Sequence, residues 1–245
     1  MLPVKDNIPN SRFPYVTVAL IVANVLVYFL VEHGGLTSVD QAAVADYGAV
    51  PYAITHCPLS ADGCAPGVPS DTPTLLTLFT SMFMHGSFLH LAGNMLFLWI
   101  FGANVEDSMN RGLYVVFYLA GGLVAVLGQT VVDPNSTAPT IGASGAVAAV
   151  LGGYLLLFPR AKVLTIVFVI LFFGVVELPA VLILGFWFVL QLMGGLADVT
   201  TPGNPGGVAY FAHIGGFVFG LAMVRAFVDR GRRKPPPAQR GAPAF

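Results

Sequence analysis

The sequence predicts an all-α membrane protein with six transmembrane helices, and three observations lead to this fold class. Of the 245 residues, 56% are hydrophobic and only 9% are charged, and the mean hydropathy is +0.79, well above that of a soluble domain. Six apolar stretches are separated by loops that contain helix breakers or charges. All 11 lysines and arginines fall on one side of the membrane when the six stretches are taken as crossings.

A helix needs roughly 20 residues to cross about 30 Å of hydrocarbon. An even number of crossings places both termini on the same side, so we expect a cytoplasmic segment 1–13, a membrane domain 14–228 and a basic, Pro-rich cytoplasmic tail 229–245. Within the membrane domain, the predicted spans are residues 14–31, 88–105, 113–132, 144–158, 178–195 and 209–228.

The basic residues indicate the orientation of these spans. Loops 32–87, 133–143 and 196–208 contain no Lys or Arg, and cytoplasmic loops are the ones that carry an excess of these residues. We therefore expect the three loops on the outer side of a bacterial inner membrane, with the first span as an uncleaved anchor. The net charge of −1 indicates no nucleic-acid partner.

The long first outer loop contains both cysteines, Cys57 and Cys64. The sequence leaves open whether they form a disulfide. His56 is adjacent, but no further ligand at metal-site spacing follows, so we assign no metal site. The apolar segment 75–84 is expected to be a helix that lies in the membrane interface.

The second span carries His90 and Asn94, four residues apart and therefore on one helical face. Both side chains can donate hydrogen bonds, either to a developing oxyanion or to a neighbouring helix as a polar clamp. His85 lies off this face and is expected to be structural or to hold water. At the other end, Glu106 and Asp107 indicate charge pairing or hydrogen bonding at a helix end.

The fourth span is short and begins at a serine. Residues 144–158 make only about 22 Å of helix, so Ser144 is expected several ångströms below the outer surface, where water must reach it through a cavity. The N–H groups and dipole of a helix N-terminus stabilise an anion formed there. Gly142 and Gly145 allow a substrate carbonyl and a neighbouring helix to approach. The alternative is an N-cap serine beside packing glycines.

The apolar segment 163–176, which precedes the fifth span, is too short to cross the membrane. It is expected to be either half a span or a segment lying on the surface. Glu177 and Pro179 predict a break before the fifth span.

His213 opens the sixth span, on the same helical face as the GxxxG pair Gly216 and Gly220. Such a face allows close helix packing, and the fourth span, with Gly145, has the small residues to be the partner. This packing would bring His213 within hydrogen-bond reach of Ser144. The alternative is a histidine that only packs or hydrogen-bonds within the bundle.

Taken together, GASGA with Ser144, HxxxN with His90 and Asn94, and AHxxGxxxG with His213 resemble the rhomboid family of intramembrane serine proteases. The resemblance runs from about residue 74 to residue 228. It implies a six-helix rhomboid-like bundle whose short central span four carries the serine. It further implies a serine endopeptidase in which Ser144 is the nucleophile and His213 the base. His90, Asn94 and the backbone at Gly142 would bind the oxyanion and the substrate.

Two features depart from the pattern of this family. Its members often place an aromatic residue one turn after the serine, packed against the histidine, whereas this chain has Ala148 there. Some members also carry a Trp-Arg pair in the first outer loop, which here has neither residue. What orients His213 is therefore left open. Asp133 and Asp198, in outer loops, are candidates for this role.

The resemblance also implies the partners. Substrates would be transmembrane segments of other proteins that enter from the lipid bilayer, with the fifth span around Gly185 and Trp187 as a gate, and no cofactor is implied.

Other protease chemistries find no support, because the chain has no HExxH motif and no aspartate within a span. The alternatives are a non-catalytic rhomboid-like protein that binds transmembrane helices, and a small transporter or channel. Ser144 and His213, both present, argue against the first. The lack of an internal repeat argues against the second.

Overall fold

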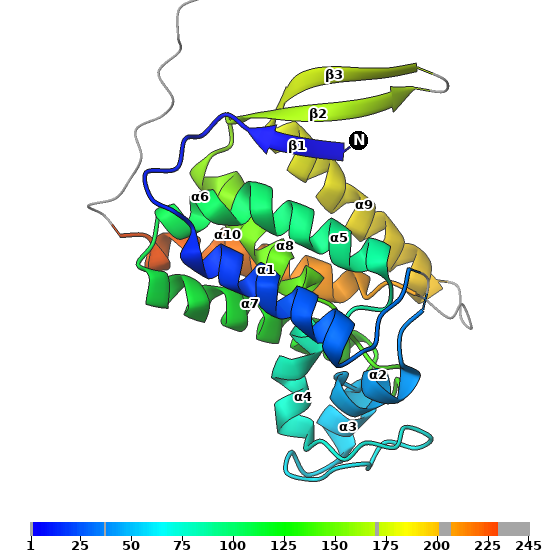
Figure 1. The fold of residues 1–245 in the computed structure, drawn as a ribbon. Helices are drawn as coiled ribbons and strands as arrows, with labels where there is room; N and C mark the ends of the chain where they lie inside the picture. The colour runs from blue at the N-terminus through cyan, green and yellow to red at the C-terminus, as the bar shows by residue number, and fades with distance from the viewer. Residues whose placement is uncertain (1, 37, 170–171, 201–206, 230–245) are drawn as a thin grey trace, which may run out of the picture.

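The computed structural model describes residues 2–36, 38–169, 172–200 and 207–229. These form a bundle of apolar helices with a small sheet along one side and a group of short helices at the opposite side (Figure 1). The apolar helices are α1 (Tyr15–Leu30), α5 (Phe88–Phe97), η2 (Leu98–Gly102), α6 (Ala103–Asp107), α7 (Arg111–Val132), α8 (Ser144–Leu157), α9 (Ala180–Thr200) and α10 (Tyr210–Phe227).

Four helices of the described chain are long and apolar enough to cross a membrane. They are Phe88–Asp107, in which α5, the π-helical η2 and α6 run on as one helix, together with Arg111–Val132, Ala180–Thr200 and Tyr210–Phe227. Two further apolar helices, α1 with 16 residues and α8 with 14 residues, are shorter. All six predicted stretches are thus helical, whereas six crossings remain a prediction.

The segment after α8 corrects the expectation of an all-α fold. Strands β2 (Lys162–Val169) and β3 (Phe172–Pro179) form an antiparallel hairpin, and β1 (Leu2–Asp6) pairs antiparallel with β2, in the order β1-β2-β3. The segment is therefore a strand hairpin and not half of a helical span, while the alternative of a segment lying on the surface is not contradicted. Val, Thr, Ile and Phe favour strands, and the expected alternation is present, since Val163 and Thr165 are buried while Leu164 is 37% exposed.

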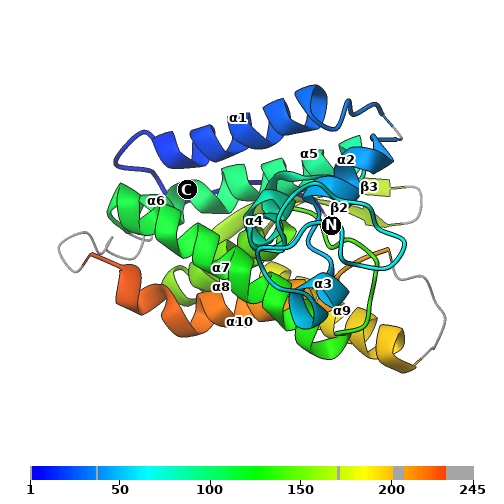
Figure 2. The ribbon, with the colours of Figure 1, turned by 90° about the horizontal axis from the view of Figure 1, so that it is seen from below.

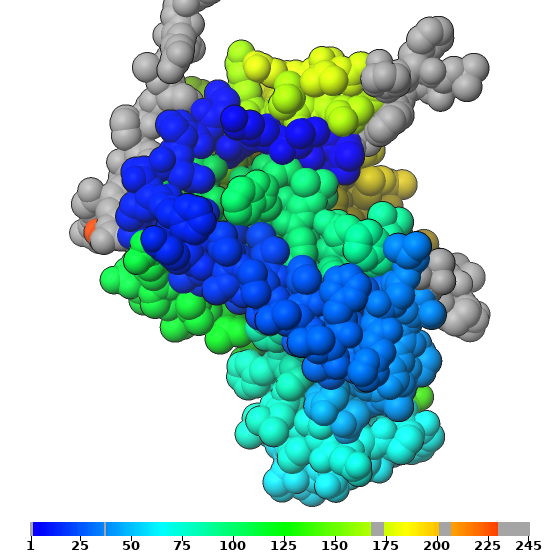
Figure 3. All heavy atoms as spheres, in the orientation of Figure 1, coloured from blue at the N-terminus to red at the C-terminus, as the bar shows by residue number. Residues whose placement is uncertain are grey.

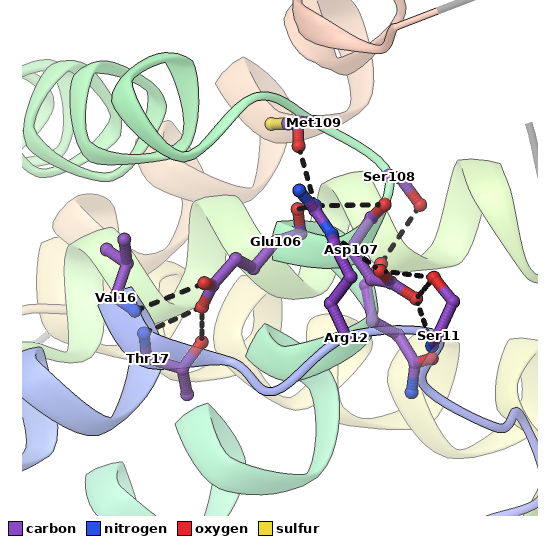
Figure 4. A network of polar contacts seen from close by, with 9 residues as sticks. Ser11, Arg12, Val16, Thr17, Glu106, Asp107, Ser108 and Met109 are labelled. Atoms are coloured by element: carbon purple, nitrogen blue, oxygen red, sulfur yellow. Dashed lines mark hydrogen bonds and ion pairs between the residues drawn. The ribbon is translucent and has the colours of Figure 1, made fainter. Parts of the chain in front are cut away.

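The N-terminal segment is built into the fold by polar contacts as well as by β1. Glu106 accepts hydrogen bonds from the backbone N–H groups of Val16 and Thr17, so its carboxylate caps the first turn of α1 (Figure 4). Asp107 accepts from Ser11 and forms an ion pair with Arg12 at 3.1 Å. The interpretation of these two acids as helix-end and ion-pairing groups is confirmed.

The loop between α1 and α5 contains α2 (Gln41–Tyr47), α3 (Pro51–His56), α4 (Thr74–Thr80) and the 3₁₀ turn η1 (Ser81–Phe83). In the space-filling view this loop projects beyond the bundle, and the N-terminal segment and α1 cover one face of the bundle (Figure 3). Cys57 and Cys64 form a disulfide, which settles the alternatives that the sequence left open. The helix predicted over 75–84 is present as α4 and η1.

Helix α8 lies at the centre of the bundle, and all of its residues from Gly145 to Tyr154 are buried. It runs beside α7 and α10 (Figure 2). Backbones meet directly at the contact with α10, because a Cβ added to Gly216 would lie 2.1 Å from the carbonyl oxygen of Gly145. A Cβ on Gly220 would lie 2.0 Å from the carbonyl oxygen of Ala149. Only glycines permit this separation of the two helices.

Candidate active site

Ser144 and His213 lie at the N-terminal ends of two adjacent helices. Ser144 is the first residue of α8, and His213 is in the first turn of α10. The serine Oγ is 2.7 Å from Nε2 of the imidazole. The capping alternative is wrong, since Ala143 occupies the N-cap position and α8 has no side-chain cap. A serine hydroxyl bonded to an imidazole can act as a nucleophile with a general base.

The other imidazole nitrogen contacts a residue that the sequence interpretation missed. Nδ1 of His213 is 2.8 Å from Oε1 of Gln191 on α9. Gln191, and neither Asp133 nor Asp198, therefore partners this nitrogen. The one available signal was a lone amide within an otherwise apolar stretch, which in a membrane helix needs a hydrogen-bonding partner.

An aromatic ring also packs against His213, but it comes from α9. The ring centroids of Trp187 and His213 are 5.8 Å apart with an interplanar angle of 37°. Ala148, in the position where the family often has an aromatic residue, is fully buried against α10 near Gly216. The support for His213 thus lies on a different helix from the one that the family pattern suggests.

Gly142 places the loop before α8 against His90. Its φ is +125°, a backbone conformation that favours glycine. An added Cβ would lie 2.8 Å from Cε1 and 2.9 Å from Nε2 of His90, and 3.4 Å from Oγ of Ser144. The His90 imidazole therefore lies next to the serine. Asn94, one turn further along α5, is buried, and its Nδ2 has no hydrogen-bond partner among the described residues.

These side chains surround a cavity of about 600 Å³. A second cavity of about 380 Å³ adjoins it, shares His90 and Ile141 with it, and is lined by polar groups that include Asp133 at the end of α7 and Asp198 in the last turn of α9. Water can therefore approach the serine from that side. The larger cavity is lined by Gly86, Ser87, Leu89, His90, Gly93, Asn94, Phe97, Ile141, Ser144, Val147, Leu151, Trp187, Gly207, Val208, Ala209 and His213.

A buried polar pair lies behind His90. The backbone N–H of His85 donates to Oε1 of Glu32 at 2.8 Å, and the rings of His85 and His90 meet edge to face, 5.1 Å apart. Burial raises the pKa of the Glu32 carboxyl to about 7, partly offset by the hydrogen bond from His85. Burial, with the neighbouring His90, lowers the pKa of His85 to about 3, so its imidazole is neutral. This arrangement fits the expected structural role of His85.

The raised pKa of Glu32 predicts a pH-dependent stability. The folded state binds this proton more tightly than the unfolded state, so stability falls as the pH rises from about 4.5 to about 7. Glu32→Gln retains the oxygen that accepts from His85 and removes the buried charge. We expect its Tm in detergent to exceed that of the wild type at about pH 8, with a smaller difference at about pH 5. The exposed Glu177→Gln is the control, and a lower Tm for Glu32→Gln at both pH values contradicts the prediction.

Comparison with known proteins finds similarity to rhomboid proteins, as the sequence motifs led us to expect. Residues 72–230 match the profile of the family described as "Rhomboid domain". Rhomboid protein 1, mitochondrial, of Saccharomyces cerevisiae is 36% identical over 97 residues, which cover 38% of this chain and 28% of that protein. Presenilin-associated rhomboid-like protein A, mitochondrial, of Danio rerio is 27% identical over 158 residues, which cover 62% of this chain and 38% of that protein. Rhomboid protease GluP of Bacillus subtilis is 30% identical over 146 residues, which cover 60% of this chain and 24% of that protein. The matched regions thus span well under half the length of these relatives.

Proposed function

The chain belongs to the rhomboid family, and we propose that it is an intramembrane serine endopeptidase that hydrolyses peptide bonds in or near transmembrane segments of other proteins. The observation that carries this proposal is the 2.7 Å contact between Oγ of Ser144 and Nε2 of His213. Both residues line a cavity of about 600 Å³, large enough to admit an extended stretch of peptide.

In the proposed reaction, Nε2 of His213 takes the proton of Ser144 while Oγ attacks the substrate carbonyl carbon. The oxyanion that forms would accept hydrogen bonds from the backbone N–H of Ser144 and from the side chains of His90 and Asn94. The imidazolium of His213 then gives its proton to the leaving amine. Water, activated by the same imidazole, hydrolyses the acyl-enzyme and restores the serine.

We propose that the substrate is a transmembrane helix that unwinds locally, because an intact helix holds its carbonyls in internal hydrogen bonds. Leu89 and Phe97 of α5 and Trp187 of α9 line the same cavity. This arrangement favours substrate entry between these two helices, with α9 as the gate.

For the membrane topology, we propose six crossings by domain 14–228, with both termini cytoplasmic. This proposal is supported by two contacts at one end of the bundle, that of Arg111 with the ring of Tyr15 and the ion pair of Arg12 with Asp107, because basic residues gather on the cytoplasmic side. Tail residues 230–245 lie outside the described residues.

The relatives include both mitochondrial proteins and a bacterial one. For this chain we propose the bacterial inner membrane.

The oxyanion assignment predicts a specific kinetic effect. Asn94→Ala is expected to lower kcat by about 100-fold with little change in KM, because its amide would bind charge that exists only in the transition state. His90→Ala is expected to act in the same direction. Steady-state cleavage of a single-span reporter measures both. A raised KM with unchanged kcat would instead place Asn94 in ground-state substrate binding.

A serine-reactive fluorophosphonate probe tests the proposed function directly. The wild type in detergent is expected to be labelled and to cut a single-span reporter, and labelling should abolish cleavage. The matched control is Ser87→Ala, since Ser87 lines the same cavity but accepts a hydrogen bond from the backbone N–H of His90. Labelling should persist in Ser87→Ala and vanish in Ser144→Ala. A folded wild type that binds the reporter but is neither labelled nor active would favour the non-catalytic helix-binding function.

A further inference from the structure

Gln191 is a buried amide on the helix proposed as the gate. It is only 9% exposed, and its immediate neighbours along α9 are apolar. Burying an amide away from water costs free energy unless both of its ends are hydrogen-bonded. Oε1 of Gln191 lies 2.8 Å from Nδ1 of His213, and its Nε2 donates to the backbone carbonyl of Trp187 at 3.3 Å. Both ends of the side chain are therefore in use.

These two contacts determine which way the amide faces. The carbonyl of Trp187 can only accept a hydrogen bond, so the NH₂ group of Gln191 must point toward it and the oxygen toward His213. The amide oxygen also only accepts, so Nδ1 of His213 must carry a proton. Nε2 of the neutral imidazole is then left with a free lone pair, facing the hydroxyl of Ser144. A general base needs this tautomer.

We propose that Gln191 is the positioning residue of the Ser144–His213 pair, holding the imidazole in the Nδ1–H tautomer and aiming Nε2 at the serine. This inference rests on the proposed protease function. The His213 imidazole is thus held by side chains of α9 and not by an aromatic residue on α8, where Ala148 supplies no ring. Trp187, whose ring packs on the same imidazole, completes that support.

A neutral amide suits this position better than a carboxylate would. An ionised aspartate would stabilise the imidazolium more strongly, but a buried charge within the bilayer carries a large desolvation cost. The amide supplies orientation and tautomer without that cost. A general base contributes roughly 10²- to 10⁴-fold to the rate. Without the amide of Gln191 the imidazole would still be present but less well oriented, so we expect only part of that factor to be lost, about 10- to 100-fold in kcat.

Two variants separate positioning from packing. Gln191→Met has similar volume but removes the acceptor, and Gln191→Glu keeps an oxygen in the same place. We expect Gln191→Met to lower kcat by about 10- to 100-fold with KM unchanged, and Gln191→Glu to recover most of this loss. Leu190→Met, on the exposed side of α9, is the packing control and should behave as the wild type. Tm values show whether each variant folds.

A second readout does not depend on activity. NMR of the protein with isotope-labelled histidine reports the tautomer of His213, assigned by comparison with His213→Ala. The expected spectrum shows Nδ1–H in the wild type and in Gln191→Glu, and its loss in Gln191→Met. Gln191→Met with full kcat, or with the Nδ1–H signal intact, overturns the inference. If the wild type does not cleave at all, the proposed function fails, while the tautomer still decides whether Gln191 holds the imidazole.

Discussion

Ser144→Ala is expected to lower kcat for reporter cleavage by about 10⁴- to 10⁶-fold while the protein stays folded. The loss is large because the variant has no atom that can form the acyl-enzyme. The fold should persist because Ser144 is not the cap of α8, and the change removes one hydrogen bond, worth about 1 kcal/mol, to His213. Turnover of a fluorogenic single-span reporter in detergent, with Tm measured alongside, gives both quantities.

His213→Ala should cost a similar factor, and the double variant should be no worse than either single one. Residues that act as one unit in the same step show this lack of additivity. Losses that multiply would show that the two side chains act in separate steps, despite their 2.7 Å contact. Cleavage by Ser144→Ala at the wild-type rate would remove the protease proposal.

The juxtaposition of Ser144 and His213 could be anticipated from local patterns. A GxxxG face along one helix and small residues along the other predict close packing, and the histidine lies on the packed face. Gln191 could not be assigned in the same way. Its partner depends on where α9 crosses α10, and the spacing of residues along a single helix carries no information about that crossing.

The sheet escaped prediction for a related reason. Strand β1 pairs with β2 across most of the chain, with Leu2 opposite Ile166. The apolar segment that contains β2 and β3 has the length of a half-span, and periodicity alone does not separate a short buried strand from a piece of helix. The antiparallel pairing of β2 with β3, which the distant strand β1 extends, resolves the ambiguity.

The close contact of α8 and α10 makes Gly216→Ala a severe change. The added methyl would lie 2.1 Å from the carbonyl oxygen of Gly145, a backbone atom that cannot turn aside, so the helices must separate or tilt. We expect the free energy of unfolding to fall by about 3 kcal/mol, with a lower Tm in detergent.

The same displacement should damage the chemistry beyond its effect on stability. Gly145 follows Ser144 directly, and Gly216 lies three residues after His213, so helix separation at this point moves the hydroxyl away from Nε2. A misplacement of about 1 Å can cost roughly 100-fold in rate, which we expect in kcat at temperatures where the variant is fully folded. Gly112→Ala near the start of α7 is the matched control, because the nearest atom that its Cβ would meet outside its own helix is Oδ1 of Asn110, at an ordinary contact distance of 3.6 Å. That control should keep full activity and gain slight stability from the better helix former. Equal behaviour of the two variants would show that α8 and α10 do not meet through these backbones.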